Sequence, residues 1–136
     1  MSEIKVDTLT GKTSAGDITV TVGATATQSL EQGLAKAWVN FTGITTTASR
    51  DSLNVSSLTD LGTGQTTVTY TNVMNDANYT GSLYQNGNPG SAINNFSNDY
   101  AGGFGNRTAS SYGIYAYSGT AVDAYHNDST IFGDLA

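Results

Sequence analysis

The sequence has no cysteine, a single histidine (His126), a single tryptophan (Trp38) and a single proline (Pro89). Without cysteine, a disulfide framework and a thiolate metal site are both excluded. Lys and Arg number 5 against 11 Asp and Glu, which gives a net charge of −6 at pH 7. This balance disfavours nucleic acid, whose binding needs clustered Lys and Arg, and it disfavours an anionic membrane surface. We therefore expect no nucleic-acid partner.

Long apolar runs are also missing. No stretch approaches the roughly 20 residues that a membrane-spanning helix needs. The start, MSEIKVDTLT, lacks the basic and apolar regions of a secretory signal. We therefore expect synthesis in a cytosol and no membrane insertion.

Aliphatic residues and Phe are scarce, since Leu, Ile, Val and Phe make up only 26 of 136 residues, whereas Thr, Ser, Asn and Gly make up 63. With high charge such a composition would indicate disorder, but only 12% of residues are charged and 8 are Tyr. The composition favours a folded β protein with a thin core. Small chains with thin cores and no disulfides are commonly stabilised by oligomerisation, so we expect association between copies of this chain.

The N-terminal part predicts two strands, over residues 3–9 and 17–22, because apolar and polar residues alternate with period two. Gly11-Lys12-Thr13, between them, resembles the end of a phosphate-binding loop. The first glycine of that motif would fall at Val6, and a strand rather than a helix follows, so a nucleotide site is rejected. The interpretation is a small hairpin or extended arm, too short to be stable alone. Its apolar residues are expected to dock against a sister subunit or a larger particle: Ile4, Val6, Leu9, Ile18, Val20 and Val22.

A short helix is predicted over residues 29–36. Ser29 and Gln32 fit a capping box, and Leu30, Leu34 and Trp38 fall on one helical face. These three apolar residues are candidates for a subunit interface. Trp38 has a second interpretation, because it also begins a strand in which it would point away from the core; an ordinary core position remains open too.

Residues 37–136 show β patterns throughout. Strands are predicted over 37–42, 51–61, 66–73 and 79–84, with a hairpin turn at 62–65 and further strands near the C-terminus. Residues 85–111 indicate a long surface loop with one short strand. The predicted class is an all-β antiparallel β-sandwich, jelly-roll-like, with an N-terminal β arm and one short helix. The predicted segments are an arm (1–28), a helical neck (29–36) and a β-sandwich domain (37–136).

Chemistry-bearing motifs are sparse. His126 has no Gly-X-Ser-X-Gly partner motif, and the only two Glu lie in the N-terminal part. Asp123, His126 and Asp128 are close in sequence but lack a recognised metal-ligand spacing. We therefore expect no enzyme, no catalytic residue, no metal site and no cofactor.

Tyrosines concentrate in the last third of the chain. Tyr is amphipathic and loses little entropy on contact, which suits interfaces and sugar stacking. The alternative is that these rings fill the domain core and a seam between subunits. Under the first interpretation, the candidate host-glycan contacts are Tyr100, Tyr112, Tyr115 and Tyr117.

Four stretches together resemble a known family: SEIKVDTLTGKTSAGDITVT, LAKAWVNFTG, ASRDSLNVSSLTDLGTGQTTVTYTNVMNDANY and the terminal IFGDLA. They are similar to short tail-fibre or virion structural proteins of marine tailed bacteriophages. The resemblance covers most of residues 2–84 and the last few, and it is weak over 85–130.

The resemblance implies a non-enzymatic, β-rich and usually trimeric protein of the virion, assembled in the cytoplasm of a bacterial host. The N-terminal arm would attach to other virion proteins, and the C-terminal part would be exposed and contact host surface glycans. The chain is short for a long fibre and suits a short tail fibre or spike. Two alternatives stay open: a capsid decoration (head fibre or cement) protein, and a carbohydrate-binding β-sandwich module.

Overall fold

The computed structural model describes residues 3–14, 18–22, 24–87, 103–117 and 120–136. The chain divides into two compact units, Met1–Leu34 and Ala35–Ala136. The predicted class is confirmed at the coarse level: the chain is mostly β, with antiparallel sheets and one short helix. The boundary falls after Leu34, so the helix belongs to the N-terminal unit, whereas the sequence predicts a separate neck over 29–36.

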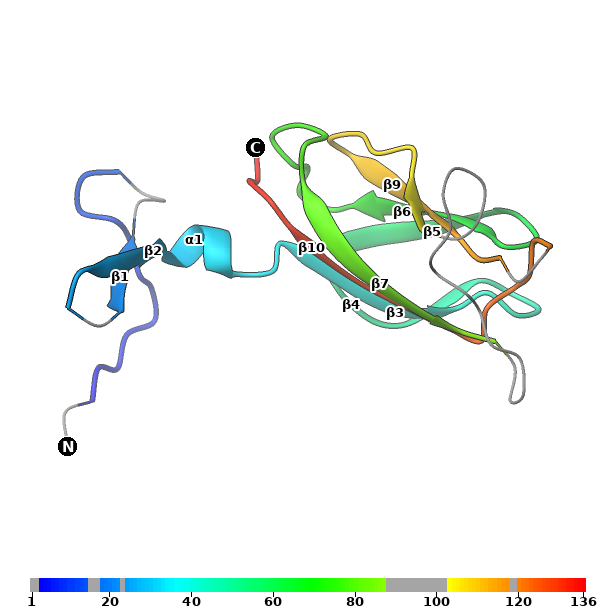
Figure 1. The fold of residues 1–136 in the computed structure, drawn as a ribbon, viewed down its shortest axis with the longest axis horizontal. Coiled ribbons are helices and arrows are strands. Elements are labelled where there is room, and N and C mark those ends of the chain that lie inside the picture. The colour runs from blue at the N-terminus through cyan, green and yellow to red at the C-terminus, as the bar shows by residue number, and fades with distance from the viewer. Residues whose placement is uncertain (1–2, 15–17, 23, 88–102, 118–119) are drawn as a thin grey trace. The chain divides into compact units, whose positions relative to one another are not determined.

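The N-terminal unit contains a two-stranded antiparallel sheet, β1 (Thr19–Val22) and β2 (Ala26–Ser29), labelled in Figure 1. Of the two interpretations of the arm, the hairpin between residues 3–9 and 17–22 is wrong, because residues 3–14 form no strand and β1 pairs with the segment that follows it. Closing the short β1–β2 connection costs less chain entropy than closing the longer one between residues 9 and 19. Asp17, the predicted start of the second strand, lies outside the described residues.

The helix is α1 (Leu30–Gly33), a single turn. Its predicted N-cap is confirmed: Ser29 is extended (φ −68°, ψ 126°), and its Oγ accepts a hydrogen bond from the Gln32 backbone N–H at 3.3 Å. The predicted end at residue 36 is wrong. Gly33 has a poor helix propensity, and Leu34 is already extended (φ −95°, ψ 139°). Trp38 therefore lies in a strand rather than on the helical face that holds Leu30.

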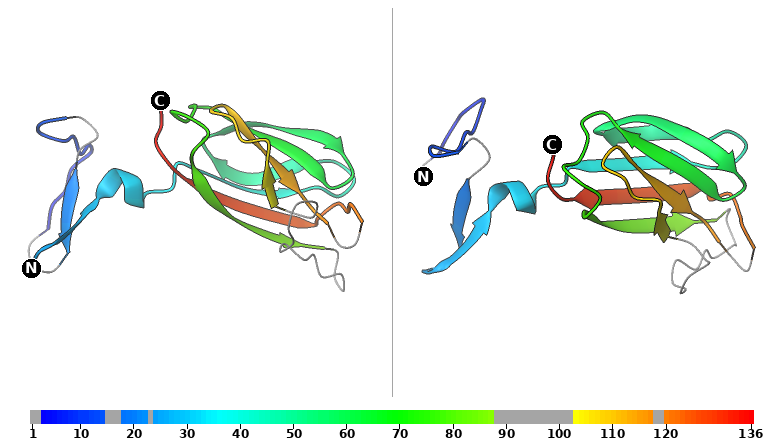
Figure 2. Two further views of the ribbon diagram at one scale, coloured as in Figure 1. Left: turned by 45° about the horizontal axis from the view of Figure 1, so that its top comes forward. Right: turned by 90° about the horizontal axis from the view of Figure 1, so that it is seen from above.

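The described residues of the C-terminal unit form two four-stranded antiparallel sheets that share a core (Figures 1 and 2). The order of the first sheet is β4-β3-β10-β7, and that of the second is β5-β6-β9-β8. The strands are β3 (Ala37–Thr42), β4 (Ala48–Leu53), β5 (Val55–Gly62), β6 (Gln65–Tyr70), β7 (Thr80–Asn86), β8 (Gly103–Gly105), β9 (Ser111–Tyr115) and β10 (His126–Phe132).

Several predicted boundaries shift. The predicted strand 51–61 is two strands, because Asn54 has a positive φ of 57° and separates β4 in one sheet from β5 in the other. The hairpin turn at 62–65 is confirmed between β5 and β6. Within the predicted loop 85–111, β7 continues to Asn86 and β8 forms the one short strand, while residues 88–102 lie outside the described part of the chain.

Alternation along the strands decides which side chains face the core. In β3, Ala37, Val39 and Phe41 are buried, whereas Trp38 is half-buried on the opposite face. This confirms the outward interpretation of Trp38. Both sheets supply the core, which consists of Ala37, Val39, Phe41, Val68, Tyr70, Met74, Tyr79, Tyr112, Ile114 and Ile131.

Tyrosine rings supply much of the core volume that aliphatic residues leave unfilled. The ring of Tyr112 lies 5.5 Å from Tyr70, 6.5 Å from Tyr79 and 5.4 Å from Phe104, measured between ring centroids. The hydroxyl of Tyr112 shares a 2.7 Å hydrogen bond with that of Ser129, and the Tyr79 hydroxyl donates to the Ser111 carbonyl at 2.9 Å. The thin aliphatic core is therefore completed by aromatic packing.

This cluster predicts that the C-terminal unit loses stability in alkali. Burial raises the pKa of Tyr112 to about 12, and burial also raises the pKa of Tyr70 and of Tyr79. A phenol with a raised folded-state pKa contributes stability that is complete below its unfolded pKa, near 10, and is lost as the pH rises through the folded value. We expect the urea midpoint to be constant from about pH 7 to 9 and to fall steeply between about pH 10 and 12. Circular dichroism across this range checks it; a constant midpoint up to about pH 12 would contradict it.

Candidate functional site

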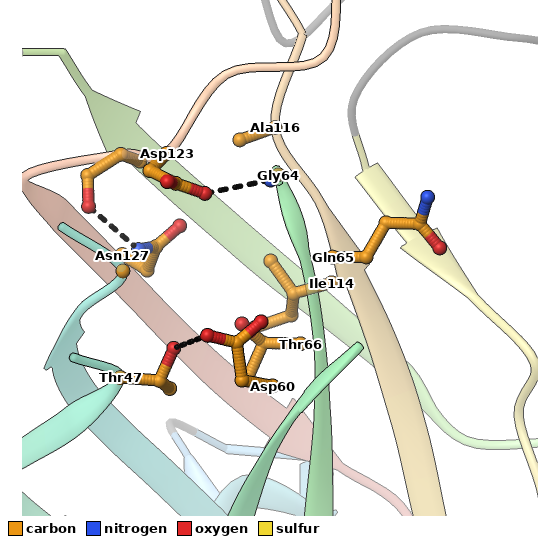
Figure 3. Close-up of a pocket in the computed structure, with 11 residues that line it drawn as sticks. Thr47, Asp60, Gly64, Gln65, Thr66, Ile114, Ala116, Asp123 and Asn127 are labelled. Atoms are coloured by element: carbon orange, nitrogen blue, oxygen red, sulfur yellow. Dashed lines mark hydrogen bonds between the residues drawn. The ribbon is translucent and has the colours of Figure 1, made fainter. Parts of the chain in front are cut away.

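Loops from both sheets meet at the end of the C-terminal unit opposite Ala35. Strand β3 runs from Ala37 toward this end, and its partner β10 starts there. The pocket in Figure 3 lies among these loops. Its lining residues are Gly43, Thr47, Asp60, Gly64, Gln65, Thr66, Ile114, Ala116, Asp123, Ala124 and Asn127.

Two carboxylates line this pocket, and both accept hydrogen bonds from groups of the protein. One Asp123 oxygen accepts a hydrogen bond from the Gly64 backbone N–H at 2.8 Å. The two oxygens of Asp60 accept bonds from the Gly62 N–H at 2.8 Å and the Thr47 hydroxyl at 3.2 Å (Figure 3 shows the latter). The cavity of about 10 Å³ has room for about one water molecule. The carboxylates therefore link neighbouring loops through hydrogen bonds and do not form a ligand site.

Gly64, which lines this pocket, has no space for a larger side chain. Its φ is +73°, its carbonyl accepts a 2.8 Å bond from Ala116, and an added Cβ would lie 2.6 Å from the Ala116 oxygen. We expect Gly64→Ala to lower the free energy of unfolding by about 2 kcal/mol or more, because strain and clash add. Gly62→Ala is the matched control, since Gly62 also has a positive φ (116°) but nothing lies within 4 Å of its Cβ position. Chemical denaturation compares the two; equal losses would contradict the clash.

The outer face of the first sheet carries a row of polar and aromatic side chains. Asp128 in β10 is the register partner of Asn40 in β3 on one side and of Tyr84 in β7 on the other. The Asn40 amide donates to the Asp128 carboxylate. Tyr84 is 59% exposed although it sits on a strand inside a well-packed unit. An exposed ring thus lies beside a hydrogen-bonded carboxylate on the outer face of this sheet.

Arg50 extends this row from β4. Its guanidinium donates to the Asn40 side-chain oxygen at 3.2 Å and to the Tyr125 carbonyl at 2.6 Å, and it lies 5.2 Å from the centre of the Tyr125 ring. Tyr125 is 44% exposed, and its ring meets that of His126 edge-on at 4.7 Å. These contacts hold the cation in place. We call Asn40, Arg50, Tyr84, Tyr125 and Asp128 the tyrosine face.

The predicted glycan contacts fall elsewhere. Tyr112 is fully buried in the core, so its prediction as a surface contact is wrong and the core interpretation holds for it. Tyr115 is half-buried, and its hydroxyl accepts a 2.7 Å bond from Asn106; Tyr117 is half-buried and bridges to Ala121. Tyr100 lies outside the described residues.

The members of the tyrosine face were not among the predicted site residues. Alternation offered a signal for two of them. Asn40 lies between the inward-facing Val39 and Phe41, and Tyr84 follows Leu83, which packs against the core, so both point outward. Arg50 and Tyr125 meet only through the tertiary fold, 75 residues apart in sequence, so no spacing rule predicts their contact.

The predicted docking residues of the N-terminal unit are largely exposed. Ile4 is 86% exposed and Val6 56%; Leu9 and Val20 are exposed too, while Ile18 is half-buried and Val22 lies in β1. Of the predicted interface residues, Leu34 is exposed and Leu30 half-buried. An apolar groove of about 220 Å³ runs between β1 and α1, lined by Val20, Gln28, Ser29, Leu30, Gly33 and Leu34.

No family model, curated protein or solved structure matches this chain. Within the described residues, no group of three or more His, Cys, Asp and Glu is placed to hold a metal ion. In that part of the chain, no helix is long and apolar enough to cross a membrane.

Proposed function

We propose that this chain is a structural protein of a bacteriophage particle, a short tail fibre or spike. Its N-terminal unit attaches to copies of itself and to other virion proteins, and its C-terminal β unit is exposed and contacts the host surface. The proposal includes no catalytic role. It rests on the resemblance of residues 2–84 to virion structural proteins and on the chemistry of the N-terminal unit.

The observation that carries the proposal is the exposure of apolar side chains in the N-terminal unit. A two-stranded sheet with one helical turn is too small to be stable in isolation, yet Ile4, Val6 and Leu9 all face solvent here. Each such side chain contributes about 1.5–3 kcal/mol when it is fully buried. Docking of the N-terminal unit against other protein would gain this free energy. The C-terminal unit already has a core of its own, so its folding does not depend on such docking.

The finer architecture belongs to the same proposal. We propose a homotrimer with a jelly-roll-like sandwich in each copy. Eight strands in two antiparallel sheets support the jelly-roll description, as does the pairing of the first and last strands, β3 with β10. The hairpins within single sheets, β3–β4 and β5–β6, depart from it.

Cryo-electron microscopy of particles carrying a tagged chain tests the proposal. We expect density for the tag at the tail, in few copies with three-fold symmetry. Density spread over the head in many copies would replace the fibre with a capsid decoration protein. Absence of the chain from purified particles would overturn both.

A carbohydrate-binding module is the second candidate function, and the tyrosine face favours it. The exposed Tyr84 ring suits the C–H face of a sugar, while the Asp128 carboxylate beside it and the Arg50 guanidinium suit hydroxyl groups. The hydrogen bonds from Arg50 to Asn40 and from Asn40 to Asp128 hold these groups before any ligand arrives. This function is compatible with a place on the virion.

We expect Tyr84→Ala to weaken binding to an array glycan about ten-fold, the equivalent of about 1.4 kcal/mol, by removing the stacking ring. Tyr115→Ala is the matched control, because this ring lies in β9 of the other sheet and its removal should leave affinity unchanged. Titration by calorimetry measures both. Failure of the unmodified chain to bind any glycan on a broad array would eliminate this second function.

A further inference from the structure

Residues 3–8 have the pattern of a strand but no strand partner. Ile4 and Val6 alternate with Glu3, Lys5 and Asp7. The Lys5 ammonium lies 3.4 Å from the Glu3 carboxylate, so these two side chains are on the same side of the segment and Ile4 is placed between them in sequence. The segment therefore has the alternation that an added strand needs, and its apolar side chains, Ile4 and Val6, are open to solvent.

The N-terminal sheet has an open edge that such a strand fits. Within the described residues, β1 pairs with β2, labelled in Figure 1, and with no other strand. One side of β1 therefore presents backbone N–H and C=O groups that no described strand pairs. Open edges of this kind accept an additional strand readily. A third strand would also bring the sheet to the size at which sheets become independently stable.

The apolar groove lies on the face of this sheet that carries Val20. Leu30 and Leu34 form its other apolar wall, and Val20 belongs to β1 itself. A cavity of about 150 Å³ lined by aliphatic side chains accepts a group as large as benzene. The groove, at about 220 Å³, therefore has room for aliphatic side chains from an added strand.

We propose that residues 3–8 of one copy add as a third strand to the free edge of β1 in a second copy, with Ile4 and Val6 in the groove. The occupant is a second copy of this chain because the same unit presents both halves of the contact, an unpaired strand and an unpaired edge. Each copy donates one strand and accepts one, and in the proposed trimer this exchange runs head-to-tail around a three-membered ring. This inference deepens the proposed function by naming how the N-terminal unit associates.

Cross-linking tests this exchange of strands. Because the chain has no cysteine, an introduced cysteine is its only thiol. A full-length tagged Val6→Cys variant is mixed with an untagged Val20→Cys variant, unfolded and refolded together, and treated with a short bis-maleimide, whose spacer tolerates small errors in register. Leu61→Cys replaces Val6→Cys as the matched control, because both parent residues are 56% exposed but Leu61 is in the C-terminal unit.

We expect cross-linked dimers of one tagged and one untagged chain from the first mixture, at least five-fold more than from the control. Equal yields from the two mixtures would overturn the proposal. So would a double variant, Val6→Cys with Val20→Cys, that cross-links only within single chains, since the segment would then fold back on its own sheet. These results come from the isolated chain, so they are independent of whether the chain is found in particles, which tests the proposed function.

Discussion

Replacement of Tyr112 by alanine is expected to bring the C-terminal unit close to unfolding. The ring contacts Tyr70, Tyr79 and Phe104 and is fully buried, so its removal leaves a cavity between the two sheets. Large-to-small substitutions of buried aromatics cost about 3–5 kcal/mol, a large share of the ~5–15 kcal/mol that stabilises a typical domain. In a domain of this size the melting temperature should fall by about 12 °C or more.

Tyr112→Phe is the matched control, because it keeps the ring and removes only the hydroxyl. It leaves the Ser129 hydroxyl without its 2.7 Å partner, which should cost about 1–3 kcal/mol, clearly less than the alanine variant. Differential scanning calorimetry of both variants provides the comparison. Equal destabilisation would mean that the hydrogen bond, and not the ring packing, holds the sheets together.

Deletion of residues 1–34 is expected to abolish incorporation into particles while the remaining chain stays folded. The C-terminal unit contains every core residue of the part of the chain that the structure describes, so its melting temperature should change little. The deletion removes the exposed side chains of Ile4, Val6, Leu9, Val20 and Leu34, which we propose form the docking surface. Immunoblots of purified particles measure incorporation.

Full-length Leu61→Asp is the control for that experiment. It alters an exposed apolar residue of the C-terminal unit, so its incorporation should match that of the unmodified chain. Normal incorporation of the truncated chain would show that the N-terminal unit is not required for docking.

The fold class could be predicted because period-two alternation reflects a physical constraint. A strand with one face in the core must alternate, so Ala37, Val39 and Phe41 indicated β3 and its orientation correctly. The cap at Ser29 is equally local, since it depends on residues three apart. Both features are determined by neighbouring residues, and sequence reasoning predicts them well.

Pairing partners and sites could not be predicted in the same way. Residues 3–9 alternate, but alternation does not specify a partner, and the nearer segment β2 pairs with β1 instead. Tyrosine is suited to both cores and surfaces, so composition alone could not assign Tyr112 to the core and Tyr84 to the surface. That distinction requires knowing which strands lie side by side, which is a property of the whole fold.

Native mass spectrometry of the full-length chain beside the chain lacking residues 1–34 tests the central claim, that the N-terminal unit drives association. The account predicts a mass of three copies for the full-length chain and of one copy for the truncated chain, at the same protein concentration. A full-length monomer would contradict the claim directly. A truncated chain that still forms trimers would place the association in the C-terminal unit and contradict it equally.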